Sequence, residues 1–166
     1  LKLDVGTQQV EKLSLNAGLK KLILNGNQLT AKPTFPPGLK ELTLNGYSLS
    51  DKDFSAAGGL NKVQLDGSFD VSGLVLPQSV EQLTLGYGNK TGSMDFGYLA
   101  NLKTFETNGG PILSEMPRLP SAVTKVDLFG FDITAANPTL DLTHLTNLNF
   151  LRVYASSAVP VTLVLP

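Results

Sequence analysis

The chain of 166 residues contains no cysteine. That absence excludes a disulfide framework, thiolate catalysis and cysteine-ligated zinc. No apolar run approaches 18 residues, so the sequence predicts no membrane-spanning helix. Charged residues make up only 16% of the chain, below the usual quarter, and the formal net charge is −1. Because no excess of positive charge is present to attract a polyanion, we expect no nucleic-acid partner.

What the sequence does contain is a repeated apolar pattern. Apolar residues return in the order apolar-x-x-apolar-x-apolar at spacings of 20 to 25 residues. The copies begin at Leu19, Leu39, Leu60, Val80, Leu102, Val123 and Leu148. A period of this length is typical of a solenoid, in which each unit buries its apolar edge against its neighbours.

The middle of each copy alternates apolar and polar residues, which predicts a strand with one buried face. Leu22 and Leu24 are expected to point inward, with Ile23 between them pointing outward. Stacked copies would form a parallel sheet whose inward rows make the core. A glycine follows most of these strands and allows the chain to leave the sheet sharply. These glycines are Gly26, Gly46, Gly67, Gly109 and Gly130.

The segments that return from one strand to the next are rich in proline, which opposes long helices. We therefore expect these segments to be extended or 3₁₀, with few helical turns. Single helical turns are predicted at Ser50–Ala57, Phe96–Asn101 and Leu142–Asn147.

The repeat resembles the leucine-rich repeat family, whose pattern is L-x-x-L-x-L-x-x-N-x-L. The first complete unit matches it with Leu19, Leu22, Leu24, Asn27 and Leu29. Leu-Pro segments such as 76–80 and 119–123 are similar to the proline-containing bacterial subclass, and 142–148 is similar to an internalin-type unit. The resemblance implies an α/β, β-rich solenoid. In that fold a right-handed superhelix carries a parallel concave sheet and a mostly irregular or 3₁₀ convex side.

Two departures from the family pattern bear on the turns and the core. The asparagine position is occupied in turn by Asn27, Tyr47, Ser68, Gly88, Gly110, Phe131 and Ser156. Because buried backbone groups need other partners where that asparagine is missing, we expect irregular turns. Thr107 also replaces an inward leucine, which predicts a locally weaker core.

The repeats predict a single domain over residues 1–166. Residues 1–18 form a degenerate N-terminal repeat, in which 1–5 and 10–15 are expected to be strands. Residues 19–147 hold six repeats, and 148–166 form a C-terminal repeat or cap.

The outward strand positions are the candidate binding surface, because they would line the concave face. In the C-terminal half these positions become aromatic and charged, and aromatics and arginine are enriched in binding hot spots. The candidate binding residues are Tyr87, Glu106, Asp127, Phe129, Phe150, Arg152 and Tyr154. An alternative is that a C-terminal cap or a following domain covers these strands.

Other motifs carry little chemistry. The glycine-rich segment 86–93 lacks the Walker order and is interpreted as an enlarged turn. Asp95-Phe96-Gly97 matches the kinase tripeptide without its accompanying motifs. His144 is the single histidine and is expected to be solvated. Two carboxylates at 51 and 53 are weak evidence for calcium. We therefore predict no catalytic residue, no metal site and no cofactor.

The sequence favours a non-enzymatic binding module that recognises a protein, or less often a glycan, through the concave sheet. A structural role in a larger surface protein is the first alternative. A glycan hydrolase using Asp127 and Glu106 is a distant one. The surface rich in Asn, Thr, Ser and Gly favours an extracellular or cell-surface protein, bacterial and exported, over a cytoplasmic one. The chain starts at Leu1 without methionine, so we expect that any signal peptide or lipid anchor has been removed.

Overall fold

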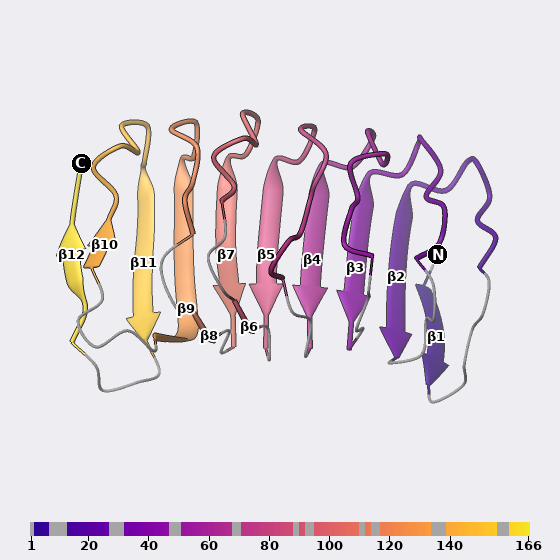
Figure 1. Cartoon of the computed structure of the whole chain (residues 1–166), viewed down its shortest axis with the longest axis horizontal. Coiled ribbons are helices and arrows are strands. Elements are labelled where there is room, and N and C mark those ends of the chain that lie inside the picture. The colour runs from indigo at the N-terminus through magenta and orange to yellow at the C-terminus, as the bar shows by residue number, and fades with distance from the viewer. Residues whose placement is uncertain are drawn as a thin grey trace.

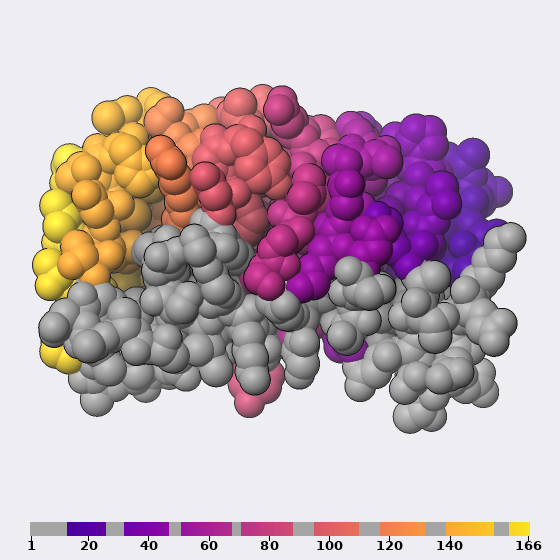
Figure 2. Space-filling model, viewed as in Figure 1, coloured from indigo at the N-terminus to yellow at the C-terminus, as the bar shows by residue number. Residues whose placement is uncertain are grey.

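A computed structural model shows a parallel-strand β-solenoid (Figure 1). The structure describes residues 2–6, 13–26, 32–46, 51–67, 71–87, 90–91, 95–109, 112–113, 117–133, 139–155 and 160–166. Strands lie side by side along the long axis of the molecule, from the N-terminal end to the C-terminal end, and return segments connect them (Figure 1). In Figure 2 successive turns follow one another as adjoining bands from indigo to yellow.

Of the ten described strands of the large sheet, eight stand side by side, each parallel to its neighbours. In spatial order they are β1 (Lys2–Gly6), β2 (Lys21–Gly26), β3 (Glu41–Asn45), β4 (Lys62–Asp66), β5 (Gln82–Gly86), β7 (Thr104–Asn108), β9 (Lys125–Ile133) and β11 (Phe150–Ala155). The strands predicted from the repeat are therefore confirmed. At the N-terminal end 2–6 is a strand as predicted, whereas 13–16 is not, and residues 7–12 lie outside the described ranges.

Equivalent residues of the repeats pair with each other in the sheet. Leu22 pairs with Leu42, which pairs with Val63, and the same register continues to Leu151. From β2 to β9 the two inward rows are no more than 3% exposed. They consist of Leu22, Leu42, Val63, Leu83, Phe105 and Val126, and of Leu24, Leu44, Leu65, Leu85, Thr107 and Leu128. The core is thus a stack of rows, as the period-two alternation predicted.

Thr107 is the polar member of these rows. Its side chain is buried, and its hydroxyl donates a hydrogen bond of 3.3 Å to the carbonyl oxygen of Phe129 on the next strand. The replacement of leucine therefore leaves no unsatisfied hydroxyl in the core.

A turn precedes each strand from β2 to β11 in the main sheet, and the first apolar residue of each repeat closes it. The N–H of that residue donates to the carbonyl oxygen three residues earlier, over 2.9 to 3.1 Å. The pairs are Leu19 with Asn16, Leu39 with Pro36, Leu60 with Ala57, Val80 with Pro77, Leu102 with Leu99, Val123 with Pro120 and Leu148 with Leu145. The first apolar position is therefore fixed by a backbone hydrogen bond in every repeat, and by full burial from Leu39 to Val123.

Two kinds of pre-strand turn alternate along the solenoid. A proline kind begins at Pro36, Pro77 and Pro120. An aspartate kind begins at Asp53, Asp95 and Asp141, whose carboxylates accept the N–H two residues on at 2.9, 2.7 and 3.0 Å. Each aspartate kind holds two consecutive turns, since Ala57, Leu99 and Leu145 close one turn and begin the next. The kinase-like tripeptide Asp95-Phe96-Gly97 is one instance of this turn motif.

Each aspartate-kind turn packs against the proline-kind turn before it. Asn101 donates its amide to the carbonyl oxygen of Gln78 at 3.0 Å, and Asn147 donates to that of Ser121 at 3.2 Å. In the first such pair Gly59 takes the equivalent place, and a Cβ added there would lie 2.2 Å from the carbonyl oxygen of Pro37. Backbone carbonyls of the proline-kind turns are thereby satisfied or closely covered.

The return segments pair with each other in short stretches. β6 (Lys90–Thr91) pairs with β8 (Ile112–Leu113), which pairs with the second half of β9. Asp53 bridges to Val75 and Asp95 bridges to Arg118. β10 (Thr139–Asp141) pairs with β12 (Thr162–Val164).

The described ranges contain no helix, so the predicted α/β character and helical turns are wrong for these residues. At 50–57, 96–101 and 142–147 the described residues form the consecutive turns of the aspartate kind. The hydrogen bonds of these turns join residues three apart, and an aspartate carboxylate accepts the N–H two residues on. The second turn leads directly into a strand. The same described segments include no helix able to cross a bilayer.

The close approach of Gly59 to the Pro37 carbonyl gives a stability prediction with a neighbouring control. Gly59→Ala should lower the free energy of unfolding by about 1–3 kcal/mol, because the added methyl must displace backbone. Gly58→Ala should leave stability unchanged or raise it by up to about 1 kcal/mol, because nothing lies within 4 Å of its Cβ position. Urea unfolding of both variants measures the difference. Equal stabilities would contradict this packing.

Candidate binding surface on the open face of the sheet

The outward strand positions form one continuous surface, here called the open face. It lies opposite the core and carries three residues from each strand, for example Lys125, Asp127 and Phe129 from β9. Because the register is unshifted, outward residues of neighbouring strands stand directly beside each other. This geometry places six of the seven sequence-predicted binding residues on the adjacent strands β7, β9 and β11.

A chain of ion pairs crosses these three strands. The Lys125 ammonium lies 2.6 Å from Glu106 Oε1 and 3.6 Å from Asp127 Oδ2. Arg152 holds Asp127 with two hydrogen bonds, 2.6 Å from Nε to Oδ1 and 2.9 Å from Nη2 to Oδ2. Thr84 on β5 extends the chain with a 3.4 Å hydrogen bond to Glu106. The charges alternate in sign across the strands, so each charged side chain is held by its neighbours.

The aromatic residues are attached to this chain of charges. The rings of Phe129 and Tyr154 stack with centroids 5.2 Å apart and an interplanar angle of 19°. The Arg152 guanidinium lies 5.1 Å from the Phe129 centroid, and the Lys125 ammonium lies 5.1 Å from the Phe150 centroid. Contacts of a cation with a ring face at these distances are attractive. The result is a patch in which aromatic and charged groups fix one another.

Asp127 is the centre of the patch. Its side chain is only 9% exposed, so its charge depends on Arg152 and Lys125 in place of water. In return, hydrogen bonding to Asp127 raises the pKa of Arg152, and hydrogen bonding to Glu106 raises the pKa of Lys125. Both cations therefore stay charged throughout the physiological range.

Tyr87 and Lys125 are the two places where the sequence prediction and the patch differ. Tyr87 is 75% exposed and lies at the end of β5, separated from Phe129 by β7. Lys125 was not among the predicted binding residues, yet it links Glu106 to Asp127. The sequence does hold a signal for Lys125: it is an outward lysine that lies between two outward acidic residues, Glu106 on β7 and Asp127 on β9.

Two hollows mark the open face. One of about 420 Å³ runs from Lys62 and Gln64 past Glu106 and Asn108 to the Phe129 ring. A second of about 340 Å³ lies over β2 to β4 and shares Lys62 and Gln64 with the first. The first hollow therefore connects Lys62 on β4 with the aromatic patch.

Asp66 sits beside these hollows and leans over the next strand. A Cβ added to Gly86 would collide with its carboxylate, so the glycine leaves the space that Asp66 fills. Half-burial raises the pKa of Asp66, opposed by a 2.6 Å hydrogen bond from Gln64. The folded state therefore favours the protonated form of Asp66 and is destabilised when this carboxylate is ionised.

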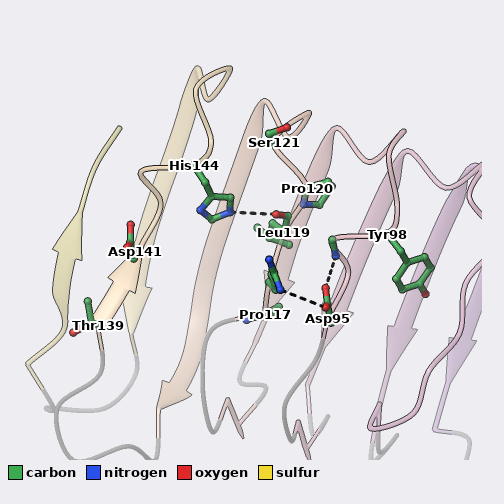
Figure 3. A pocket seen from close by; sticks show the side chains of 11 residues that line it. Asp95, Tyr98, Pro117, Leu119, Pro120, Ser121, Thr139, Asp141 and His144 are labelled. Carbon is green, nitrogen blue, oxygen red and sulfur yellow. Dashed lines mark hydrogen bonds and ion pairs between the residues drawn. The ribbon is translucent and has the colours of Figure 1, made fainter.

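A hollow of about 740 Å³ lies on the return side and is shown in Figure 3. It is lined by parts of turns, among them Asp95, Arg118, Asp141 and His144. Asp95 and Asp141 bind backbone N–H groups of their turns, and His144 Nε2 lies 3.1 Å from the Leu119 carbonyl oxygen. Because these polar groups serve the turns, we place the candidate site on the open face.

The glycan-hydrolase alternative would use Asp127 and Glu106 of the open face. Both oxygens of Asp127 accept hydrogen bonds from Arg152, and Glu106 is bound by Lys125 and Thr84. The two carboxylates are thus engaged with neighbouring side chains instead of facing each other across an open cleft. Within the described ranges no group of three histidine or acidic side chains is placed to hold a metal ion.

Comparison of the chain with known proteins gave no match among family models, curated proteins or solved structures. The assignment of the fold therefore rests on this chain's own strands and contacts.

The burial of Asp127 predicts a strong dependence on Arg152. Arg152→Gln should lower the urea midpoint, because Asp127 would keep only the longer contact with Lys125. The double variant Asp127→Asn/Arg152→Gln should recover most of the loss, since no unpaired charge stays buried. A double variant that loses as much as the two single variants together would contradict the coupling.

The raised pKa of Asp66 predicts a pH dependence of stability. A carboxyl whose pKa is higher in the folded state stabilises the fold when protonated, and this contribution is lost as pH rises through the folded pKa. Asp66→Asn should therefore be more stable than the parent at neutral pH, and the difference should vanish below about pH 3. Unfolding curves at several pH values measure it.

Glu41→Gln is the control of opposite sign for this measurement. The Lys21 ammonium, 2.8 Å away, lowers the pKa of Glu41. Its contribution is present above the ordinary glutamate range and is lost as pH falls through the folded pKa. This variant should therefore be less stable than the parent at neutral pH. Two variants that shift in the same direction would contradict the assignment of Asp66.

Proposed function

We propose that the chain is a non-enzymatic recognition module that binds a protein partner on the open face. The observation that carries this proposal is the patch on β7, β9 and β11. There Phe129, Phe150 and Tyr154 are 41%, 43% and 61% exposed while Arg152 holds a nearly buried Asp127. Exposed aromatic side chains around a fixed arginine are the composition of protein-binding hot spots.

Rigidity of the patch supports the same function. Phe129 and Tyr154 are stacked, and Arg152 is held by two hydrogen bonds, before any partner arrives. β9 is paired with β7 on one side and with β11 on the other, so the backbone beneath the stacked rings is also fixed. A preordered surface loses less side-chain entropy on docking, which leaves more of the contact energy for affinity.

We propose in addition that the chain is a divergent member of the leucine-rich repeat family. The spacing of the repeats, their inward leucines and the parallel sheet support this assignment. It would diverge in two features, the absence of a helix from the described part of the return side and the replaced asparagine. Under this proposal the open face corresponds to the surface on which the family binds its partners.

The proposed function predicts the effect of removing the stacked rings. Phe129→Ala/Tyr154→Ala should weaken partner binding by roughly thirty-fold or more, because hot-spot side chains contribute about 2 kcal/mol each. A crosslinking pull-down from the native host, read by mass spectrometry, supplies the partner, and calorimetry supplies both affinities. Circular dichroism should show the parent fold.

Val75→Ala is the matched control, because Val75 is a comparably exposed apolar side chain on the return side, at 42%. It should bind the partner as the parent does. Equal binding by the parent, the control and the double variant would contradict a site on the open face and would favour the structural role instead.

A further inference from the structure

We infer that the partner presents an extended peptide segment with two anchors, a carboxylate that binds Lys62 and an apolar side chain that packs on the Phe129–Tyr154 pair. This inference rests on the proposed function, because it names the kind of partner that the open face would take. Its first basis is the charge left unpaired on that face, and its second is the distance between the two anchor points.

Lys62 is the first anchor. Among the described cations of the open face, Lys21, Lys125 and Arg152 each form an ion pair, whereas Lys62 forms none. The acidic neighbour Glu41 is bound to Lys21, although Lys62 also helps to lower its pKa. The Lys62 residue is exposed and borders both hollows. An anionic group on the partner would complete this position by charge complementarity.

The Phe129–Tyr154 pair is the second anchor. The Phe129 ring of this pair lines the opposite end of the 420 Å³ hollow that begins at Lys62. Both rings remain substantially exposed although they stack on each other. An apolar side chain placed against them would remove aromatic surface from water at a point already flanked by Arg152.

The sheet sets the distance between the anchors. Lys62 begins β4 and Phe129 lies in β9, three strands away, with four residues of offset along the strands. Strand spacing of about 4.8 Å and a rise of about 3.3 Å per residue give roughly 19 Å between the two Cα atoms. An extended peptide covers that distance in about five or six residues. The segment would therefore cross the strands diagonally.

The contacts within the patch favour a peptide over a glycan. Glu106 is bound by Lys125, and Asp127 is bound by Arg152, so few of their groups remain to bind sugar hydroxyls. The Phe129 ring contacts both Tyr154 and the Arg152 guanidinium, which limits the ring face available to a flat sugar. What remains is apolar ring surface and one unpaired cation, which match an apolar and an acidic side chain.

A displayed library of random dodecapeptides tests the inference on the intact chain. Selected peptides should carry Asp or Glu about five or six residues from Phe, Tyr, Trp or Leu. Synthetic copies in which the acid is replaced by its amide should bind at least tenfold more weakly by fluorescence anisotropy. Selected peptides without that spacing, or a library with no binders beside a glycan array that binds, would overturn the inference.

Variants separate this inference from the proposed function. With Lys62→Gln, acidic and amide peptides should bind equally, whereas Lys103→Gln, which changes an exposed lysine one residue before β7, should keep the difference. Phe129→Ala/Tyr154→Ala should lose both peptides. If Lys62→Gln keeps the acid preference while the aromatic variant still loses binding, the inference fails and the open-face site stands. If the aromatic variant binds the peptides unchanged, both fail.

Discussion

The structure depends on parallel pairing that stays unshifted from β2 as far as Tyr154 of β11. Because each residue pairs with the residue at the same place in the next repeat, equivalent positions form rows across the sheet. The inward rows make the apolar core, and the outward rows make a continuous surface. A slip of one residue on any strand would exchange these two faces, so the buried rows hold the register for the exposed ones. The geometry of the patch around Asp127 therefore depends on the apolar rows buried on the other face of the sheet.

Much of the fold was predictable because the period-two alternation is a local signal. Leu22 and Leu24, and their equivalents, were enough to predict the strands, their parallel stacking and the inward rows. The return segments were less predictable, because their structure depends on backbone hydrogen bonds. The helical turn predicted at 142–147 has helix-like apolar spacing, yet Asp141 accepts the N–H of Thr143 and the chain closes two short turns instead. Six of the seven residues at the asparagine position, all except Phe131, lie outside the described ranges, so the irregular turns expected there stay a prediction.

The candidate site was predictable residue by residue but not as a network. Outward positions follow from the alternation, so the aromatics and charges of the last strands could be named. The contacts among these side chains could not be predicted, because the reach of each charged side chain decides which of several neighbours it contacts. Lys125 shows this: in the sequence it is one outward lysine among several, and in the structure it lies between Glu106 and Asp127. Tyr87 shows the converse, since its exposure is as expected but β7 separates it from the stacked rings.

Because proline-kind and aspartate-kind turns alternate, the structural unit of this solenoid is a block of two repeats, one with each kind of turn. Corresponding positions recur from Leu39 to Val80 and from Val80 to Val123, intervals of 41 and 43 residues. Removing one repeat would bring two turns of the same kind together, and the amide of Asn101 or Asn147 would no longer meet its carbonyl in the turn beside it. Removing or duplicating a whole block would keep every such contact. Solenoids of this design should therefore vary in length by steps of about two repeats.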